Sequence, residues 1–130
     1  MTTADSESRS TQQQDPCRTR EVLDIVGDKW SLLVVRNLSQ GPLRFTELKR
    51  AIDGISQRML TVTLRSLERD GILTRTVRNV MPPHVSYELT STGKTLRQAT
   101  APLLEWSITH LAHIDAARTT YDARHDTSPA

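Results

Sequence analysis

The side chains with the most evident chemistry in this sequence lie in the segment GISQRMLTVTLRSLERDGI, residues 54–72. Its polar residues fall on one side of a helix with about 3.6 residues per turn, and they are Ser56, Gln57, Arg58, Thr61 and Arg65. Arg and Gln can each form paired hydrogen bonds with a base edge, Arg with guanine and Gln with adenine. Ser56, Thr61 and the helix N-terminus suit phosphate oxygens. This face therefore has the chemistry needed to bind DNA.

The opposite side of the same helix is apolar. We expect it to pack inward through Ile55, Met59, Leu60, Thr63, Leu64 and Leu67. The acidic residues Glu68 and Asp70 come late, so the N-terminal half is the part that suits a major groove about 12 Å wide. The alternative is that this is the ordinary solvated face of a surface helix. The neighbouring elements are needed to distinguish this interpretation from DNA binding.

Further basic residues flank this segment. Arg44, Lys49 and Arg50 precede it, and Arg75, Arg78 and His84 follow it. The formal net charge of the chain is only +2, but residues 17–93 hold twelve basic and eight acidic groups, so the positive excess lies in the middle. Each flanking residue by itself is best interpreted as a surface charge that favours solubility. The six residues together predict contacts with DNA phosphates or with a minor groove.

The elements that must position these residues follow from periodicity and capping signals. A first helix over residues 19–26 should end at Gly27 in a left-handed conformation, and Asp28 should cap a second, largely buried helix that ends before Gly41. A third, short helix carries Phe45, Leu48 and Ile52. Ser56 should cap the fourth helix, which runs through Asp70.

A β-hairpin follows, with strand formers over residues 73–80, alternation over residues 85–90 and a stiff tip at residues 81–84. A last helix should cover residues 91–118, with Pro102 kinking or splitting it. This order predicts a mainly α fold with a small β-hairpin wing (α+β), namely a winged helix-turn-helix. Residues 1–16 should form a disordered tail, residues 17–118 the domain and residues 119–130 a flexible tail.

Several classes of function lack support in the sequence. It has no glycine-rich phosphate loop and no nucleophile elbow, so we expect no enzyme, and we expect no cofactor. His110 and His113 are three residues apart, but only Asp115 could join them as a metal ligand, so surface histidines are the better interpretation and no metal is expected. Without an apolar membrane span or signal peptide, the expected location is the cytoplasm.

A series of segments in fixed order closely resembles the HxlR family of bacterial transcription regulators, relatives of the MarR group. It comprises Cys17, GDKW at 27–30, GPLRFTEL at 41–48, GISQRML at 54–60, LRSLERDG at 64–71, PPHVSYELT at 82–90 and Gly93. The resemblance implies a homodimeric winged helix-turn-helix that binds double-stranded DNA. Two departures stand out, because the family commonly has Pro where Arg18 follows Cys17 and Gly where Ser107 follows Trp106.

A single reading helix contacts few base pairs, so two copies and an inverted-repeat operator are expected, with reading helices about 34 Å apart. The spare apolar surface for dimerisation lies in the first and last helices, at Val22, Ile25, Leu103, Leu104, Trp106 and Leu111. The alternative is that all of these side chains belong to the core.

Cys17 is the only cysteine. A helix N-terminus and the nearby Arg18 and Arg20 would favour its reactive thiolate. Some members of the resembled family sense quinones, aldehydes or oxidants through a cysteine at this place. Cys17 could respond through an intermolecular disulfide, an adduct or a sulfenic acid, or it could be an inert thiol at the dimer.

Two other functions remain open at this point. The polar helix could bind an acidic protein instead of DNA, or the regulator could be switched by a non-covalent small-molecule ligand. Steep salt dependence together with a preferred duplex would distinguish DNA binding from protein binding.

Overall fold

The computed structural model describes residues 16–126, with side chains from Arg18 onward. Residues 1–15 of the expected N-terminal tail and residues 127–130 lie outside the described part. The chain divides into two units, one through Arg97 and one from Gln98. No helix of the described residues is long and apolar enough to cross a membrane.

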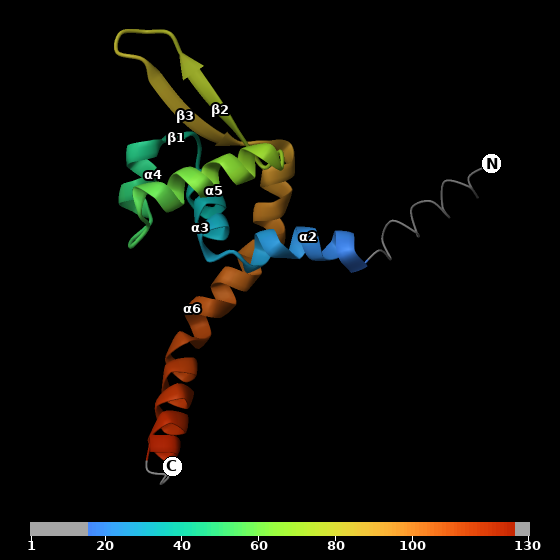
Figure 1. The fold of residues 1–130 in the computed structure, drawn as a ribbon, viewed down its shortest axis with the longest axis vertical. Coiled ribbons are helices and arrows are strands. Elements are labelled where there is room, and N and C mark those ends of the chain that lie inside the picture. The colour runs from blue at the N-terminus through green and yellow to red at the C-terminus, as the bar shows by residue number, and fades with distance from the viewer. Residues whose placement is uncertain (1–15, 127–130) are drawn as a thin grey trace, which may run out of the picture. The chain divides into compact units, whose positions relative to one another are not determined.

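Three short helices and a β-hairpin form the centre of the first unit (Figure 1). In chain order the elements are α2 (Pro16–Gly27), α3 (Lys29–Leu38), β1 (Leu43–Arg44), α4 (Phe45–Ala51), α5 (Gln57–Arg69), β2 (Leu73–Arg78), β3 (His84–Leu89) and α6 (Ser91–Asp126). The chain is thus mainly helical with one small antiparallel sheet, and the expected winged helix-turn-helix is confirmed.

Two of the expected helix caps are present. The Asp28 carboxylate accepts hydrogen bonds from the backbone N–H of Trp30 at 3.1 Å and from the Ser31 hydroxyl at 2.7 Å. The Ser56 hydroxyl accepts a hydrogen bond from the backbone N–H of Met59 at 3.0 Å. Each cap satisfies an N–H group that has no partner inside its own helix, so α3 and α5 begin at the positions the sequence predicts.

The expected left-handed stop at Gly27 is wrong. Gly27 remains helical and is not among the glycines with positive φ. The break comes one residue later, because Asp28 takes an extended conformation at φ −84° and ψ 110°. Its N–H still donates to the carbonyl oxygen of Asp24, 3.1 Å away, so α2 passes into α3 without a left-handed residue.

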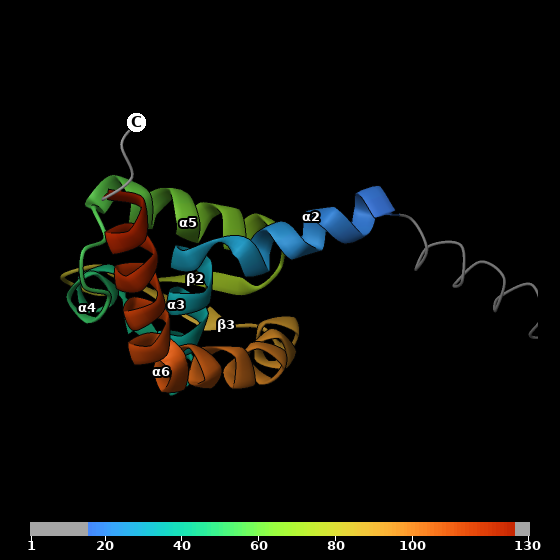
Figure 2. The same cartoon turned by 90° about the horizontal axis from the view of Figure 1, so that it is seen from below.

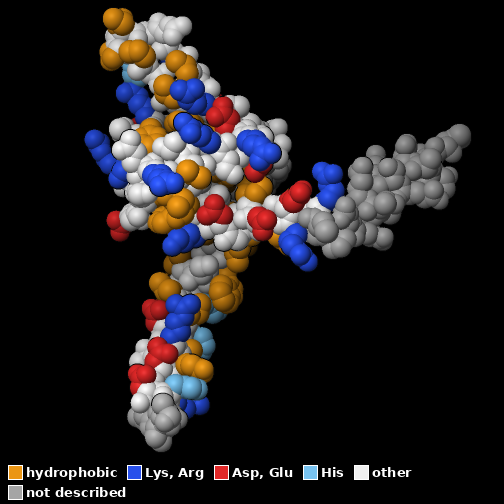
Figure 3. All heavy atoms as spheres, viewed as in Figure 1, with side chains coloured by type: hydrophobic (Ala, Val, Ile, Leu, Met, Phe, Trp, Pro, Cys, Tyr) orange, Lys and Arg blue, Asp and Glu red, His pale blue; other side chains and the backbone are white. Residues whose placement is uncertain are grey.

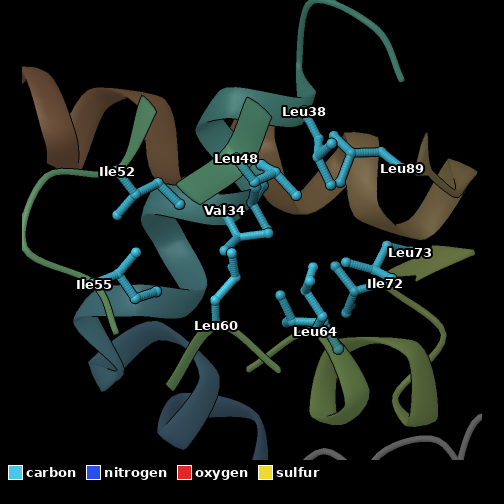
Figure 4. Packing of buried hydrophobic residues seen from close by; sticks show 12 residues of the cluster. Val34, Leu38, Leu48, Ile52, Ile55, Leu60, Leu64, Ile72, Leu73 and Leu89 are labelled. Carbon is cyan, nitrogen blue, oxygen red and sulfur yellow. The ribbon is translucent and has the colours of Figure 1, made fainter. Parts of the chain in front are cut away.

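The core lies where α3, α4 and α5 meet the base of the hairpin. In Figure 4, Leu60 and Leu64 of α5 point toward Val34 of α3 and Leu48 of α4. The predicted inward face of α5 is confirmed at Ile55, Leu60, Thr63, Leu64 and Leu67, which are all buried. Met59 is the exception at 41% exposed, because it lies at the edge of the apolar stripe.

The sheet has three strands in the order β1, β3, β2, and both pairings are antiparallel. Strand β1 was not expected, since two residues are too few to show an alternating pattern. His84 was expected in the tip but begins β3, where it pairs with Arg78. The tip therefore comprises residues 79–83, and the hairpin projects away from the three helices (Figure 1). In the view from below, β2 and β3 lie behind the helices (Figure 2).

Helix α6 is longer than the sequence suggested. It continues through Pro102 without a split and extends to Asp126, so most of the tail expected at residues 119–130 is helical. No Gly or Pro stands between residues 102 and 129, and no helix breaker therefore occurs near Arg118. The hydroxyls of Thr119 and Thr120 donate to carbonyl oxygens four residues earlier, at 2.9 and 3.0 Å.

Candidate nucleic-acid interface

The polar face of α5 turns away from the core. Ser56, Gln57, Arg58 and Arg65 are exposed, and Thr61 is half-buried. The Ser56 oxygen accepts the capping bond, so its O–H is still able to donate to a ligand. The Thr61 hydroxyl instead donates to the carbonyl oxygen of Gln57 at 2.9 Å. Thr61 thus offers an acceptor here rather than the donor that a phosphate requires.

Four arginines on α5 and β2 have no side-chain partner among the residues whose side chains the structure describes. Within residues 18–126, the guanidinium groups of Arg58, Arg65, Arg75 and Arg78 make no side-chain hydrogen bond and no ion pair. Figure 3 shows Lys and Arg side chains gathered over α5 and the lower part of the hairpin. Unpaired guanidinium groups of this kind are available to an anionic ligand.

The hairpin divides its basic residues between two faces. Side chains alternate along β2, and the register pairs Arg75 with Tyr87 and Arg78 with His84. Arg75 shares a hollow of about 310 Å³ with α5, lined by Phe45, Thr61, Leu64, Arg65, Glu68, Arg75 and Tyr87. We call this the α5–wing hollow. It brings together Arg65 and Arg75, which are ten positions apart in the sequence.

The other face of the hairpin carries a second basic group. Arg44, Arg78 and His84 line a separate hollow of about 330 Å³. The Arg44 guanidinium contacts the His84 ring at Nδ1 and lies 3.2 Å from Nε2. The backbone N–H of Arg44 donates to the Glu47 carboxylate at 2.9 Å, which holds the start of α4. Lys49 and Arg50 are exposed on α4 but line neither hollow.

Some residues of this surface were not predicted. Glu68, Phe45 and Tyr87 line the α5–wing hollow. Glu68 lies seven residues after Thr61 and three after Arg65, and helical spacing alone was enough to place it beside them. No local signal could have indicated Tyr87, whose position depends on the pairing of β3 with β1 and β2.

The residues expected at a dimer interface lie on α2 and α6. Val22, Leu103, Trp106 and Leu111 are 45–59% exposed, whereas Ile25 and Leu104 are half-buried. Ile25 packs against the core cluster. The Trp106 ring stacks on His110 with 4.6 Å between ring centroids, and Ile108 is 63% exposed. Among the described residues, the apolar side chains of α6 around Trp106 are thus largely exposed to solvent.

Cys17 is the second residue of α2, and its side chain lies outside the described part of the chain.

Among the residues that the structure describes, no three His, Cys, Asp or Glu side chains come close enough to hold a metal ion. Nδ1 of His110 donates to the Trp106 carbonyl oxygen at 3.0 Å, which is a local contact within the helix.

Comparison with known proteins agrees with this geometry. The family model for the HxlR-like helix-turn-helix matches residues 25–115. The HTH-type transcriptional regulator YtfH of Escherichia coli K12 is 39% identical over 104 residues, which cover 80% of this chain and 82% of that protein. The solved structure of ytfH from Salmonella typhimurium has 38% identity and a TM-score of 0.71, and covers 82% of this chain and 94% of that one.

A third similar protein is the redox regulator HypR, solved in its oxidized form. It is 40% identical, with a TM-score of 0.67, and the match covers 72% of this chain and 96% of that one. The matched family and relatives are DNA-binding transcriptional regulators and not enzymes. The chain belongs to the HxlR-like helix-turn-helix family of transcriptional regulators.

Proposed function

We propose that this regulator binds an inverted-repeat operator as a homodimer and represses transcription by occupying the promoter. The observation that supports the proposal is the exposed N-terminal half of α5. In its first turn, the side chains of Gln57 and Arg58 are exposed to solvent. The buried side of the same helix is held by α3 and α4. This is the arrangement in which a helix-turn-helix presents a reading helix to a major groove.

Different residues would perform different parts of the binding. Gln57 and Arg58 would bond base edges, and the Ser56 hydroxyl and the N-terminus of α5 would bind a phosphate. Arg78, His84 and Arg44 would contact the backbone or minor groove beside the hairpin. Because these three lie on the hairpin face away from the α5–wing hollow, they would contact a different stretch of DNA from α5.

Dimerisation would use the exposed apolar side chains of α2 and α6. Val22, Trp106 and Leu111 are each more than half exposed, which is costly for large apolar groups in water. A two-fold axis through paired helices would set the two reading helices about 34 Å apart, or one turn of duplex. The proposed operator therefore has two half-sites in inverted orientation.

We further propose that oxidation or alkylation of Cys17 releases the DNA. Two facts support the proposal: the sole cysteine stands in the first turn of α2, one of the two proposed dimer helices, and the similar protein HypR is a redox regulator. A bulky or covalent change at Cys17 would alter the packing of α2. The inducer would be an oxidant, a quinone or an aldehyde, all of which react with a thiolate.

Selection of bound fragments from a genomic DNA library, with and without diamide, tests the proposal. The expected result is an enriched inverted repeat that is lost in the oxidised sample. Affinity for the enriched duplex should exceed that for a random duplex and should fall steeply with added salt. A chain that enriches no sequence, or that instead binds acidic proteins through α5, would refute the DNA-binding role.

A further inference from the structure

We propose that the α5–wing hollow is a clamp for one DNA phosphodiester, held between Arg65 of α5 and Arg75 of β2 and restrained by Glu68. This inference rests on the proposed function. It assigns Arg65 to the DNA backbone rather than to base reading, and it gives Glu68 a role in DNA affinity.

The position of Arg65 along α5 supports the assignment. Arg65 stands nine residues after the cap Ser56, which is about 13 Å along the axis at about 1.5 Å per residue. A major groove is about 12 Å wide. If the first turn of α5 lies among the bases, Arg65 is at the edge of the groove, where the sugar-phosphate backbone runs.

The composition of the hollow favours a single negative charge. The guanidinium groups of Arg65 and Arg75 and the carboxylate of Glu68 line one space of about 310 Å³. None of the three makes an ion pair or hydrogen bond with another side chain of residues 18–126. Two positive charges and one negative charge leave a formal excess of +1, which matches one phosphodiester.

The walls of the hollow suit the rest of a nucleotide unit. Leu64, which is buried, and the half-buried rings of Phe45 and Tyr87 also line it. A deoxyribose beside the phosphate would contact these rings. The hollow lies between the proposed reading helix and the hairpin, so a DNA strand that leaves the groove toward the hairpin would pass over it.

Arginine variants test the clamp. Binding of the full chain to a selected duplex and to a random duplex would be measured by fluorescence anisotropy over a range of salt concentrations. Arg65→Ala and Arg75→Ala should each weaken both duplexes by about tenfold, so that the ratio of the two affinities stays unchanged. Circular dichroism would confirm that the variants fold.

The salt dependence tests whether both arginines hold the same phosphate. Each single variant should leave the slope of log K against log salt almost unchanged, because the remaining arginine still neutralises the phosphate, and the double variant should reduce the steepness of the slope by about 0.9. A fall of about 1.8 in the double variant would show two separate phosphates and overturn the clamp. A change of base preference in Arg65→Ala would overturn it as well.

Glu68→Gln should strengthen binding to both duplexes by about two- to fivefold, because a negative charge beside the phosphate is removed. Asp70→Asn is the matched control, since Asp70 directly follows the last residue of the same helix but lines a different hollow with Glu21, Asp24 and Arg69. At about 0.15 M salt its effect should be smaller, because screening acts over about 8 Å. Equal effects would overturn the role of Glu68.

The two proposals fail in different ways. A parent chain that binds no duplex would refute the proposed function and the clamp together. A parent chain that prefers an operator, but whose Arg65→Ala and Arg75→Ala variants bind as the parent does, would refute the clamp alone.

Discussion

Gly93 lies so close to the carbonyl oxygen of Ile72 that a side chain at position 93 would collide with it. The same carbonyl accepts a hydrogen bond from the backbone N–H of Thr90 at 3.0 Å, and the Thr90 hydroxyl donates to the Gly71 carbonyl at 2.5 Å. The Thr90 oxygen in turn accepts from the N–H of Gly93 at 3.1 Å. These contacts fasten the first turn of α6 to the link between α5 and β2.

Gly93→Ala should therefore lower the free energy of unfolding by about 1–3 kcal/mol, because a backbone group must move to accommodate the new methyl group. Urea unfolding monitored by circular dichroism would measure it. Gly27→Ala is the control, since nothing lies within 4 Å of a Cβ at Gly27 and its φ is not positive. The control should be unchanged or up to about 1 kcal/mol more stable. An unaffected Gly93→Ala variant would contradict the close approach.

Leu64→Ala should destabilise the domain by about 2–5 kcal/mol through a cavity beneath α5, because Leu64 is 2% exposed. Val62→Ala on the same helix should change the stability by less than about 0.5 kcal/mol, because Val62 is 54% exposed. Denaturant midpoints of both variants would be compared. Similar losses in the two variants would show that the inward face of α5 is misplaced.

Arg58→Ala should cost about 1–3 kcal/mol of operator binding and relax the base preference, because its guanidinium group is proposed to bond a base edge. Arg78→Ala should weaken all duplexes alike, because it is proposed to contact phosphate or groove edge without reading a sequence. Competition between operator and random duplex would separate the two effects. If Arg58→Ala leaves operator affinity unchanged, the reading face is wrongly assigned.

Cys17→Ser should bind the operator as the parent does but should fail to release it when diamide or a quinone is added. The reason is that serine cannot form a disulfide, a thioether adduct or a sulfenic acid. Band shifts with and without oxidant would measure release. An equal response of the variant and the parent would remove Cys17 from the switch.

Trp106→Glu and Leu111→Glu should shift the protein from dimer to monomer at about micromolar concentration, because a buried unpaired charge opposes association. Sedimentation velocity would report the state. Thr109→Glu is the control, because Thr109 stands on the opposite side of α6 from the apolar stripe. A dimer that persists in both test variants would place the interface elsewhere.

Much of the fold could be predicted because it depends on neighbours along the chain. The caps at Asp28 and Ser56 and the buried stripe of α5 follow from spacing within one or two turns. The errors have local causes too. Gly27 is compatible with a helix as well as with a left-handed stop, and Met59 lies at the boundary between the two sides of α5.

The candidate site was predicted less completely. The sequence indicated which residues are basic, and the exposed positions of Arg58 and Arg65 agree with the predicted polar face. It did not indicate that Arg75 faces α5 while Arg78 faces the other way. A single strand shows only that the two residues alternate, and the choice of face depends on how the sheet packs against the helices.

The sequence by itself determined helix α5, its cap, its apolar side and the family pattern, because periodicity and capping are properties of short segments. Only the tertiary structure decided that β1 pairs with β3 and that Arg65, Glu68 and Arg75 line one hollow. Those relationships join residues of different helices and strands through strand register and helix packing. No local pattern of residue types contains that information.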